Sequence, residues 1–113
     1  MHEYSIVQDL LSKVEEQCLT RHAHSVHRLR IRIGELSGVE PDLLELAWET
    51  FREASICRGA PLEIRRVDAV WTCPKCNRRI ERGTRLQCPD CAVPARLTEG
   101  EEIILDQIEM EVA

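Results

Sequence analysis

The sequence predicts a small α/β (α+β) fold in which two helices pack on a three-stranded mixed sheet, with a four-cysteine module inserted between two strands. Three observations lead to it. Two stretches carry apolar residues at helical spacing, three stretches alternate apolar and polar residues, and two cysteine pairs separate the last two alternating stretches. We therefore expect an α/β domain of residues 1–70 plus 97–113 and an inserted metal-binding module of residues 71–96.

The first helix is expected from Ser5 to Thr20. Ser5 and Gln8 have the spacing of a capping box, in which each side chain satisfies a free backbone donor. We expect the four residues before this helix to lie outside the core. The second helix is expected to begin at Pro41, a residue favoured in the first helical turn, and to end near Gly59.

Three strands are expected at residues 29–33, 62–71 and 103–112. In the first, apolar residues alternate with an arginine row formed by Arg28, Arg30 and Arg32, which predicts one buried and one solvated face. In the other two, the alternation changes parity part-way, which is typical of a β-bulge. The arginine row is expected to face solvent, with contact to an acidic partner as the alternative.

The composition excludes several classes of protein. The chain has 113 residues and a formal net charge of −5, which argues against a general nucleic-acid binder. Its longest apolar runs have three residues, whereas a membrane span needs about 20. The start Met1-His2-Glu3 has no apolar signal region, so we expect a cytoplasmic protein that does not bind membranes. No nucleophile–base pair or phosphate-binding loop is apparent, so an enzyme is not expected.

Four of the six cysteines form two Cys-Pro-x-Cys motifs, Cys73 to Cys76 and Cys88 to Cys91. Each motif can present two thiolates from one tight turn, and four thiolates complete a closed tetrahedral Zn(II) site. A closed site leaves no position for water, so we expect zinc to be structural. Iron in a rubredoxin-like site and a redox dithiol pair are the alternatives.

The charge of this module bears on nucleic-acid binding. Residues 73–91 include five basic and two acidic residues, a formal sum of +3, and four thiolates with one Zn²⁺ lower it to +1. That is a weak footprint for phosphate, and residues 73–91 include no aromatic side chain to stack on a base. A zinc-ribbon module that binds nucleic acid or the transcription machinery remains one alternative function, and a metal sensor is another.

A second metal site is expected at the N-terminus. A histidine at position two can bind a metal through the α-amine of Met1, the amide nitrogen of His2 and its imidazole, and Glu3 offers a fourth donor through its amide or carboxylate. Planar, nitrogen-rich coordination suits Ni(II) and Cu(II). Binding should weaken on acidification because the ligands must lose protons. A solvated terminal histidine is the plain alternative.

These features together resemble one known family. The residues that carry the resemblance are Met1 to Ser5, the Ile33-Gly34-Glu35 turn after the basic-faced strand, and the paired cysteine motifs before the last strand. They resemble HypA/HybF, the nickel metallochaperones of [NiFe]-hydrogenase maturation, over essentially the whole chain. The resemblance implies transient Ni(II) at Met1, His2 and Glu3, and structural Zn(II) at the four cysteines, Cys73, Cys76, Cys88 and Cys91. It also implies delivery to the hydrogenase large subunit with a HypB-type GTPase, and makes Glu40 a further candidate near nickel.

The remaining histidines and cysteines are expected to have ordinary roles. His22, His24 and His27 are expected in an exposed loop and solvated, with a second metal site as the alternative. Cys18 is expected to be a small core residue, and Cys57, near a helix end, is expected to bind no metal. Whether the protein is a monomer or a homodimer is left open by the sequence.

Overall fold

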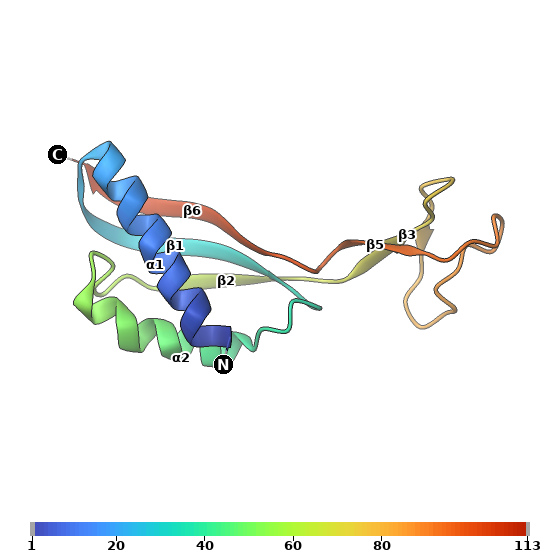
Figure 1. Cartoon of the computed structure of the whole chain (residues 1–113), viewed down its shortest axis with the longest axis horizontal. Coiled ribbons are helices and arrows are strands. Elements are labelled where there is room, and N and C mark those ends of the chain that lie inside the picture. The colour runs from blue at the N-terminus through green and yellow to red at the C-terminus, as the bar shows by residue number, and fades with distance from the viewer. Residues whose placement is uncertain (1, 113) are drawn as a thin grey trace.

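The chain folds into an elongated molecule with two β-sheets, one near each end (Figure 1). The computed structural model describes residues 2–112, apart from the side chain of His2. The molecule measures 56 × 27 × 17 Å, and its radius of gyration is 18.0 Å. A compact domain of this length would have a radius of roughly 13 Å. The elongation arises because the two sheets lie end to end, joined by the short connections of residues 68–69 and 100–102 (Figure 1).

The first sheet has the strand order β2-β1-β6. The central strand β1 (Ala23–Gly34) pairs parallel with β2 (Leu62–Val67) and antiparallel with β6 (Ile103–Val112). The prediction of a three-stranded mixed sheet is therefore confirmed. The parity change in the last strand is a bulge, because the pairing passes from Arg30↔Gln107 to Ile31↔Leu105 and skips Asp106.

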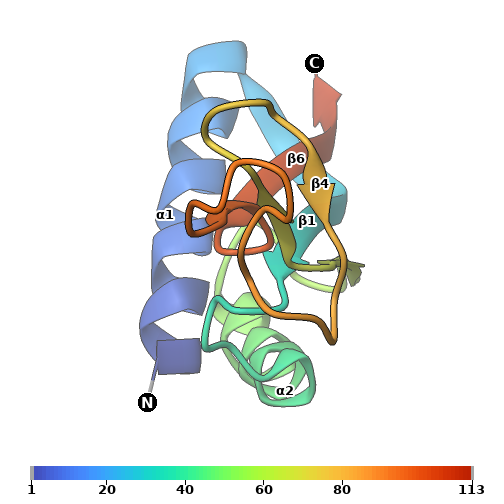
Figure 2. The same cartoon turned by 90° about the vertical axis from the view of Figure 1, so that its right-hand side faces the viewer.

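Helices α1 (His2–Arg21) and α2 (Pro41–Phe51) cover one face of this sheet, and a short 3-10 helix, η1 (Arg52–Ala54), follows α2 (Figures 1 and 2). The predicted start of the first helix at Ser5 is wrong. Ser5 is exposed within the helix and cannot be its cap, and Glu3 in the first turn is buried. Packing of that turn against α2 extends the helix beyond the capping-box pattern.

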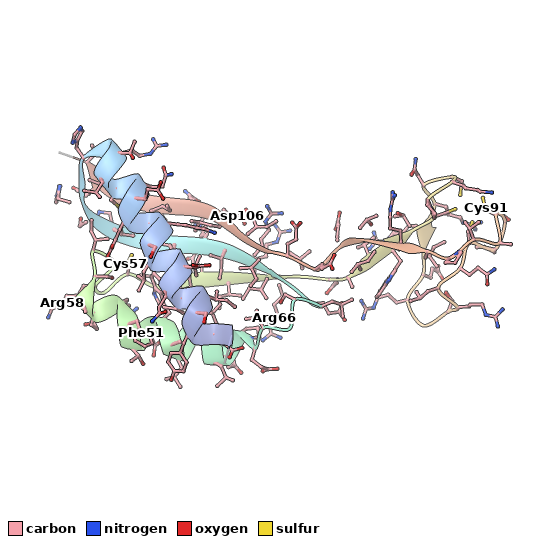
Figure 3. The ribbon with its side chains drawn as sticks, in the orientation of Figure 1. Phe51, Cys57, Arg58, Arg66, Cys91 and Asp106 are labelled. Carbon is pink, nitrogen blue, oxygen red and sulfur yellow. The ribbon has the colours of Figure 1, made fainter. Side chains whose placement is uncertain are left out.

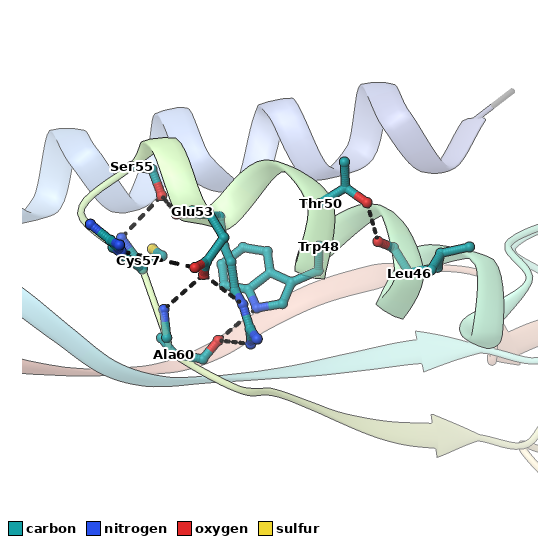
Figure 4. Close-up of polar contacts among 10 residues, drawn as sticks. Leu46, Trp48, Thr50, Glu53, Ser55, Cys57 and Ala60 are labelled. Atoms are coloured by element: carbon teal, nitrogen blue, oxygen red, sulfur yellow. Dashed lines mark hydrogen bonds and ion pairs between the residues drawn. The ribbon is translucent and has the colours of Figure 1, made fainter.

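The core lies between the helices and the sheet, and its side chains are almost all aliphatic. The residues it draws from α1 recur every three or four positions, as expected for a helix that buries one stripe. Trp48 is the only fully buried aromatic side chain among residues 2–112, and its indole nitrogen donates a hydrogen bond to the carbonyl of Ala60 at 2.8 Å (Figure 4). The buried core residues of the two helices and the central strand are Val7, Leu10, Val14, Cys18, Val26, Leu29, Ile31, Ile33, Leu44, Ala47 and Trp48.

The second sheet has the order β4-β3-β5 and carries the cysteine motifs. Its strands are β3 (Val70–Thr72), β4 (Arg79–Ile80) and β5 (Arg96–Glu99). The expectation of one bulged strand over residues 62–71 is wrong: β2 ends at Val67, and the chain enters the other sheet at Val70. The parity change itself lies inside β2, between Ile64 and Val67, where the pairing with β1 continues without a bulge.

Two glycines bring the chain segments close together where the sheets meet. The amide of Gly34 donates to the carbonyl of Glu102 at 2.9 Å, and the amide of Leu36 donates to the carbonyl of Gly100 at 2.7 Å. A Cβ at Gly34 would lie closer than 3.0 Å to backbone atoms of Gly100 and Glu101. Glycine is therefore required at position 34 by close approach of two backbones. No helix among residues 2–112 is long and apolar enough for a membrane span.

Candidate metal centre

The four cysteines of the two motifs converge at one end of the molecule, where Figure 3 labels Cys91. Their Sγ atoms all lie within 4.8 Å of one another, and those of Cys76 and Cys88 are 3.8 Å apart. Cys73 and Cys88 are buried, whereas Cys76 is exposed and Cys91 is intermediate. Four convergent sulfur atoms are the donor set of a tetrahedral Zn(II) or Fe site, so these residues fit such a metal.

The two motifs have nearly the same backbone geometry. In the first, the amide of Asn77 donates to the carbonyl of Cys73 at 2.9 Å, and in the second the amide of Ala92 donates to that of Cys88 at the same distance. Asn77 and Ala92 both have positive φ, 63° and 55° respectively. This left-handed conformation is the one that favours glycine, and Asn tolerates it better than Ala. The sequence places no glycine at either position, yet both turns close.

Hydrogen bonds between these groups separate the pKa values of the thiols. The backbone amides of Cys76 and Lys75 donate to Sγ of Cys73 at 3.5 and 3.4 Å and lower the pKa of that thiol to about 6. A hydrogen bond to Cys73 raises the pKa of Cys91 to about 12. One thiolate thus forms readily, and a bound cation is what would allow the others to ionise beside it.

The N-terminal candidates are only partly within the described residues. Met1 and the side chain of His2 lie outside them, and the backbone of His2 begins α1. Glu3 has only 8% of its surface exposed, and its carboxylate accepts a hydrogen bond from the amide of Glu40 at 3.4 Å. Glu40 immediately precedes α2, so the first turn of α1 is bound to the start of α2. The Glu3 carboxylate therefore already has a protein partner.

The three histidines are exposed as expected, but only His22 lies in the connection between α1 and β1. His22 precedes β1 with a φ of 57°, and His24 and His27 belong to that strand. The imidazole of His27 is 2.7 Å from the carboxylate of Glu111 on β6. Among the side chains of residues 3–112, the only cluster of potential ligands is that of the four cysteines, and His22, His24 and His27 contribute to none.

The remaining predicted side chains form internal contacts. The arginine row lies on the outer face of the first sheet, where Arg28 and Arg30 both pair with Glu63 and Arg32 pairs with Asp106. Cys18 and Cys57 are free and fully buried, and burial raises the pKa of Cys57 to about 11. A buried thiol with a raised pKa is a poor nucleophile and a poor metal ligand.

One ion pair that the sequence does not reveal joins the two sheets. Both amino groups of the Arg82 guanidinium lie 2.6 Å from the Glu35 carboxylate, which also accepts a hydrogen bond from the amide of Ala69 at 2.8 Å. The hydrogen bonds from Arg82 lower the pKa of Glu35 to about 2. Arg82 also lies over the ring of Trp71, 6.0 Å from its centroid. Glu35 follows β1, so this bridge ties the cysteine module to the first sheet.

Comparison with known proteins agrees with this combination of fold and metal centre. Residues 1–110 match the family described as "Hydrogenase/urease nickel incorporation, metallochaperone, hypA". The hydrogenase maturation factor HypA of Shewanella baltica strain OS185 is 41% identical over 113 residues, which cover 98% of this chain and 97% of that protein. The chain belongs to the HypA family. A HypA of Aquifex aeolicus is 36% identical and is matched over 99% of both chains.

Solved structures of HypA proteins have the same fold. The solution structure of the nickel metallochaperone HypA from Helicobacter pylori superposes with a TM-score of 0.74 at 31% identity and covers 98% of each chain. A second HypA solution structure has a TM-score of 0.80 at 33% identity and covers 97% of this chain and 96% of the other. The chain is thus a metallochaperone of nickel incorporation and not an enzyme, as predicted from the sequence.

Proposed function

We propose that the chain carries Ni(II) at its N-terminus and delivers it for the maturation of [NiFe]-hydrogenase. The donors are the α-amine of Met1, the amide nitrogen and imidazole of His2, and the amide nitrogen of Glu3. The observation that carries this proposal is the buried carboxylate of Glu3, which is bound to the amide of Glu40. Because that carboxylate holds the first turn of α1 in place, we assign it the role of anchor and leave the fourth nickel donor to the Glu3 amide.

The helical start favours such a chelate. The first four amides of an α-helix have no carbonyl acceptor within the helix, and α1 begins at His2. The amides of His2 and Glu3 are therefore free to lose their protons to a metal without breaking the helix. Since the ligands must be deprotonated, nickel is released as the pH falls. A terminal site of this kind also suits a carrier, which has to give up its cargo.

An extension of the N-terminus tests the chelate. Adding two residues before Met1 moves the α-amine away from His2, and should abolish the square-planar absorbance of bound Ni(II) in the untagged protein. A two-residue extension after Ala113 is the matched control and should leave that absorbance unchanged. Nickel bound with the same spectrum and affinity by the N-terminally extended protein would contradict the proposed donor set.

Two substitutions of Glu3 separate the anchor from a ligand. Glu3→Gln keeps an oxygen that can accept the hydrogen bond from Glu40, so the nickel spectrum should persist. Glu3→Ala removes the acceptor and should weaken nickel binding while the amide donor remains. If Glu3→Gln instead changed the nickel coordination as strongly as Glu3→Ala, the carboxylate would be a ligand and the anchor role would be wrong.

We further propose that the four cysteines hold a permanent Zn(II), and that residues 71–96 form a structural module within the domain of residues 1–70 plus 97–113. A closed site of four thiolates supports structure because it offers no exchangeable position. The expected result is one zinc per chain by elemental analysis after chelation with a weak chelator. Cys73→Ala should lose the zinc and the protection of module amides from hydrogen exchange, while Cys57→Ala, at a buried free thiol, should retain both.

We propose the partners from the resemblance to the HypA family. A HypB-type GTPase would supply the nucleotide hydrolysis that this chain lacks, and the hydrogenase large subunit would receive the nickel. The family description names both hydrogenase and urease, so the acceptor is to be identified by assay. The test compares hydrogenase maturation in cells that carry the N-terminally extended chain with maturation in cells that carry the unextended chain.

A further inference from the structure

The segment from the end of β1 to the end of α2 contains no basic residue. Residues 33–51 include five acidic side chains and no Lys, Arg or His. Three of these acids lie on α2 itself and are exposed: Asp42, Glu45 and Glu49. Within residues 2–112, none of the three forms an ion pair, whereas acids on the first sheet such as Glu63 and Asp106 are paired with arginines. The charge of α2 is therefore not neutralised by the chain itself.

Large apolar side chains are exposed on the same helix. Leu43 is 50% exposed and Leu46 is 59% exposed, while Leu44 and Trp48 on the inner side are fully buried. Residues three apart lie on one side of a helix, so Leu43 and Leu46 form an apolar stripe beside the acids. Tyr4 on α1 packs against the same helix and is also exposed. It is 41% exposed, and its ring meets the edge of the Phe51 ring with centroids 5.4 Å apart.

We call the surface made by Tyr4, Asp42, Leu43, Glu45, Leu46 and Glu49 the acidic–apolar face. Two of its acids are unfavourable in the isolated helix. Glu45 and Glu49 are four residues apart, and like charges at this spacing destabilise a helix by roughly 0.2–0.5 kcal/mol. Glu49 also lies towards the negative end of the helix dipole, which disfavours an anion. Exposed leucines beside unneutralised acids are explained by a ligand that covers both.

We propose that the acidic–apolar face docks a positively charged, leucine-bearing helix of a partner protein. Lysine or arginine side chains of that helix would neutralise Asp42, Glu45 and Glu49, and its leucines would cover Leu43 and Leu46. A second copy of this chain fits poorly because it would place two acidic stripes against each other. The face begins at Tyr4, so it adjoins the N-terminus. That the docked protein exchanges nickel rests on the proposed function, whereas the docking itself does not.

The test uses a labelled peptide of about 14 residues, built from leucine and lysine at helical spacing, and the zinc-loaded full chain. Affinity is measured by fluorescence anisotropy in about 0.15 M salt, where long-range attraction is screened. Leu46→Ser and the pair Glu45→Lys with Glu49→Lys should each weaken binding about tenfold or more. Amide shifts in NMR spectra should be confined to α2 and the start of α1.

Matched controls separate this face from general charge and hydrophobicity. Glu15→Lys with Glu16→Lys changes the net charge equally at exposed positions of α1, and Leu19→Ser removes an apolar side chain that is 78% exposed. Both controls should change the affinity by less than about twofold. Equal losses in control and α2 variants would overturn the proposal, as would equally tight binding of a peptide with glutamate in place of lysine.

Two further measurements distinguish a partner helix from a second copy of this chain, and the docking proposal from the proposed function. If the chain alone forms a concentration-dependent dimer in sedimentation that Leu46→Ser abolishes, the occupant is a second copy and the proposal is wrong. Ni(II) binding, measured on the same variants, should be unchanged. A wild-type chain that binds the peptide but no nickel would contradict the proposed function alone, and a chain that binds nickel but no peptide would contradict only the docking face.

Discussion

Replacement of Gly34 by alanine should disrupt the junction between the two sheets. Gly34 has no positive φ, so the backbone conformation itself admits alanine. The obstacle is space, because the new Cβ would lie 2.7 Å from the amide nitrogen of Glu101 and closer still to the backbone of Gly100. The two segments cannot separate freely, since they are joined by the hydrogen bonds of Gly34 to Glu102 and of Leu36 to Gly100.

The magnitude follows from these contacts. Overpacking typically costs about 1–3 kcal/mol, and each weakened hydrogen bond adds about 1 kcal/mol. We therefore expect the free energy of unfolding to fall by about 3 kcal/mol for Gly34→Ala, which for a chain of this length lowers the Tm by roughly 12 °C. Gly38→Ala is the matched control. Gly38 has a φ of +80°, and a Cβ at this position would have nothing within 4 Å, so only backbone strain of about 1 kcal/mol applies.

The assay is thermal unfolding of both zinc-loaded variants, followed by circular dichroism, with amide shifts to locate the change. Gly34→Ala should shift the amides of Ala69 and Gly100 at the junction and leave those of the α1 core in place. A Tm for Gly34→Ala equal to that of Gly38→Ala would refute the reasoning, because steric overlap would then add nothing to the ordinary cost of replacing a loop glycine.

Three other predictions follow from single contacts. The pKa of Glu35 is about 2, against an ordinary 4.5, so its bridge to Arg82 should stabilise the fold fully above pH 4.5 and be lost as the pH falls towards 2. NMR titration of the Glu35 carboxyl carbon measures this pKa. A titration midpoint near 4.5 would contradict the prediction. Ala92→Gly should stabilise the zinc-loaded module by about 1 kcal/mol, because Ala92 has a φ of 55°, which favours glycine. An unchanged or lower denaturant concentration at the unfolding midpoint would show that the left-handed turn is not strained. Trp48→Phe should lower the free energy of unfolding by about 2 kcal/mol, because it removes the hydrogen bond to Ala60 and leaves a cavity. A decrease in the free energy of unfolding no larger than that of a substitution at an exposed site would contradict a structural role for the buried indole.

Much of the fold is predictable from local pattern. The alternation of Leu29, Ile31 and Ile33 identifies a strand with one buried face, and the recurrence of Val7, Leu10 and Val14 identifies a buried helical stripe. Both patterns reflect the geometry of a single element, which adjacent residues alone determine. The ends of elements are harder to predict. Helix α1 starts three residues before Ser5, because packing of Glu3 against the start of α2 outweighs the local capping signal.

The metal centre and its surroundings are likewise predictable only in part. The spacing within each cysteine pair predicts one tight turn with two thiols, and the structure brings all four Sγ atoms together. The bridge between Glu35 and Arg82 is beyond prediction, because the two residues are 47 positions apart and follow strands of different sheets. Arginine and glutamate are too common for such a pair to be found by type alone. The placement of His24 and His27 in β1 is likewise missed, since histidine carries little strand preference.

By itself, the sequence determined the secondary-structure types, the mixed sheet, the clustered thiols and the resemblance to nickel metallochaperones, because each depends on residue types at short spacing. Only the tertiary structure decided that the chain passes into a second sheet after Val67. It also decided that Glu3 is anchored at the start of α2, and that Leu43 and Leu46 are left uncovered beside unpaired acids. Each of these depends on which distant segments meet. Contacts between distant segments follow from how the whole chain packs, which no short stretch of residues encodes.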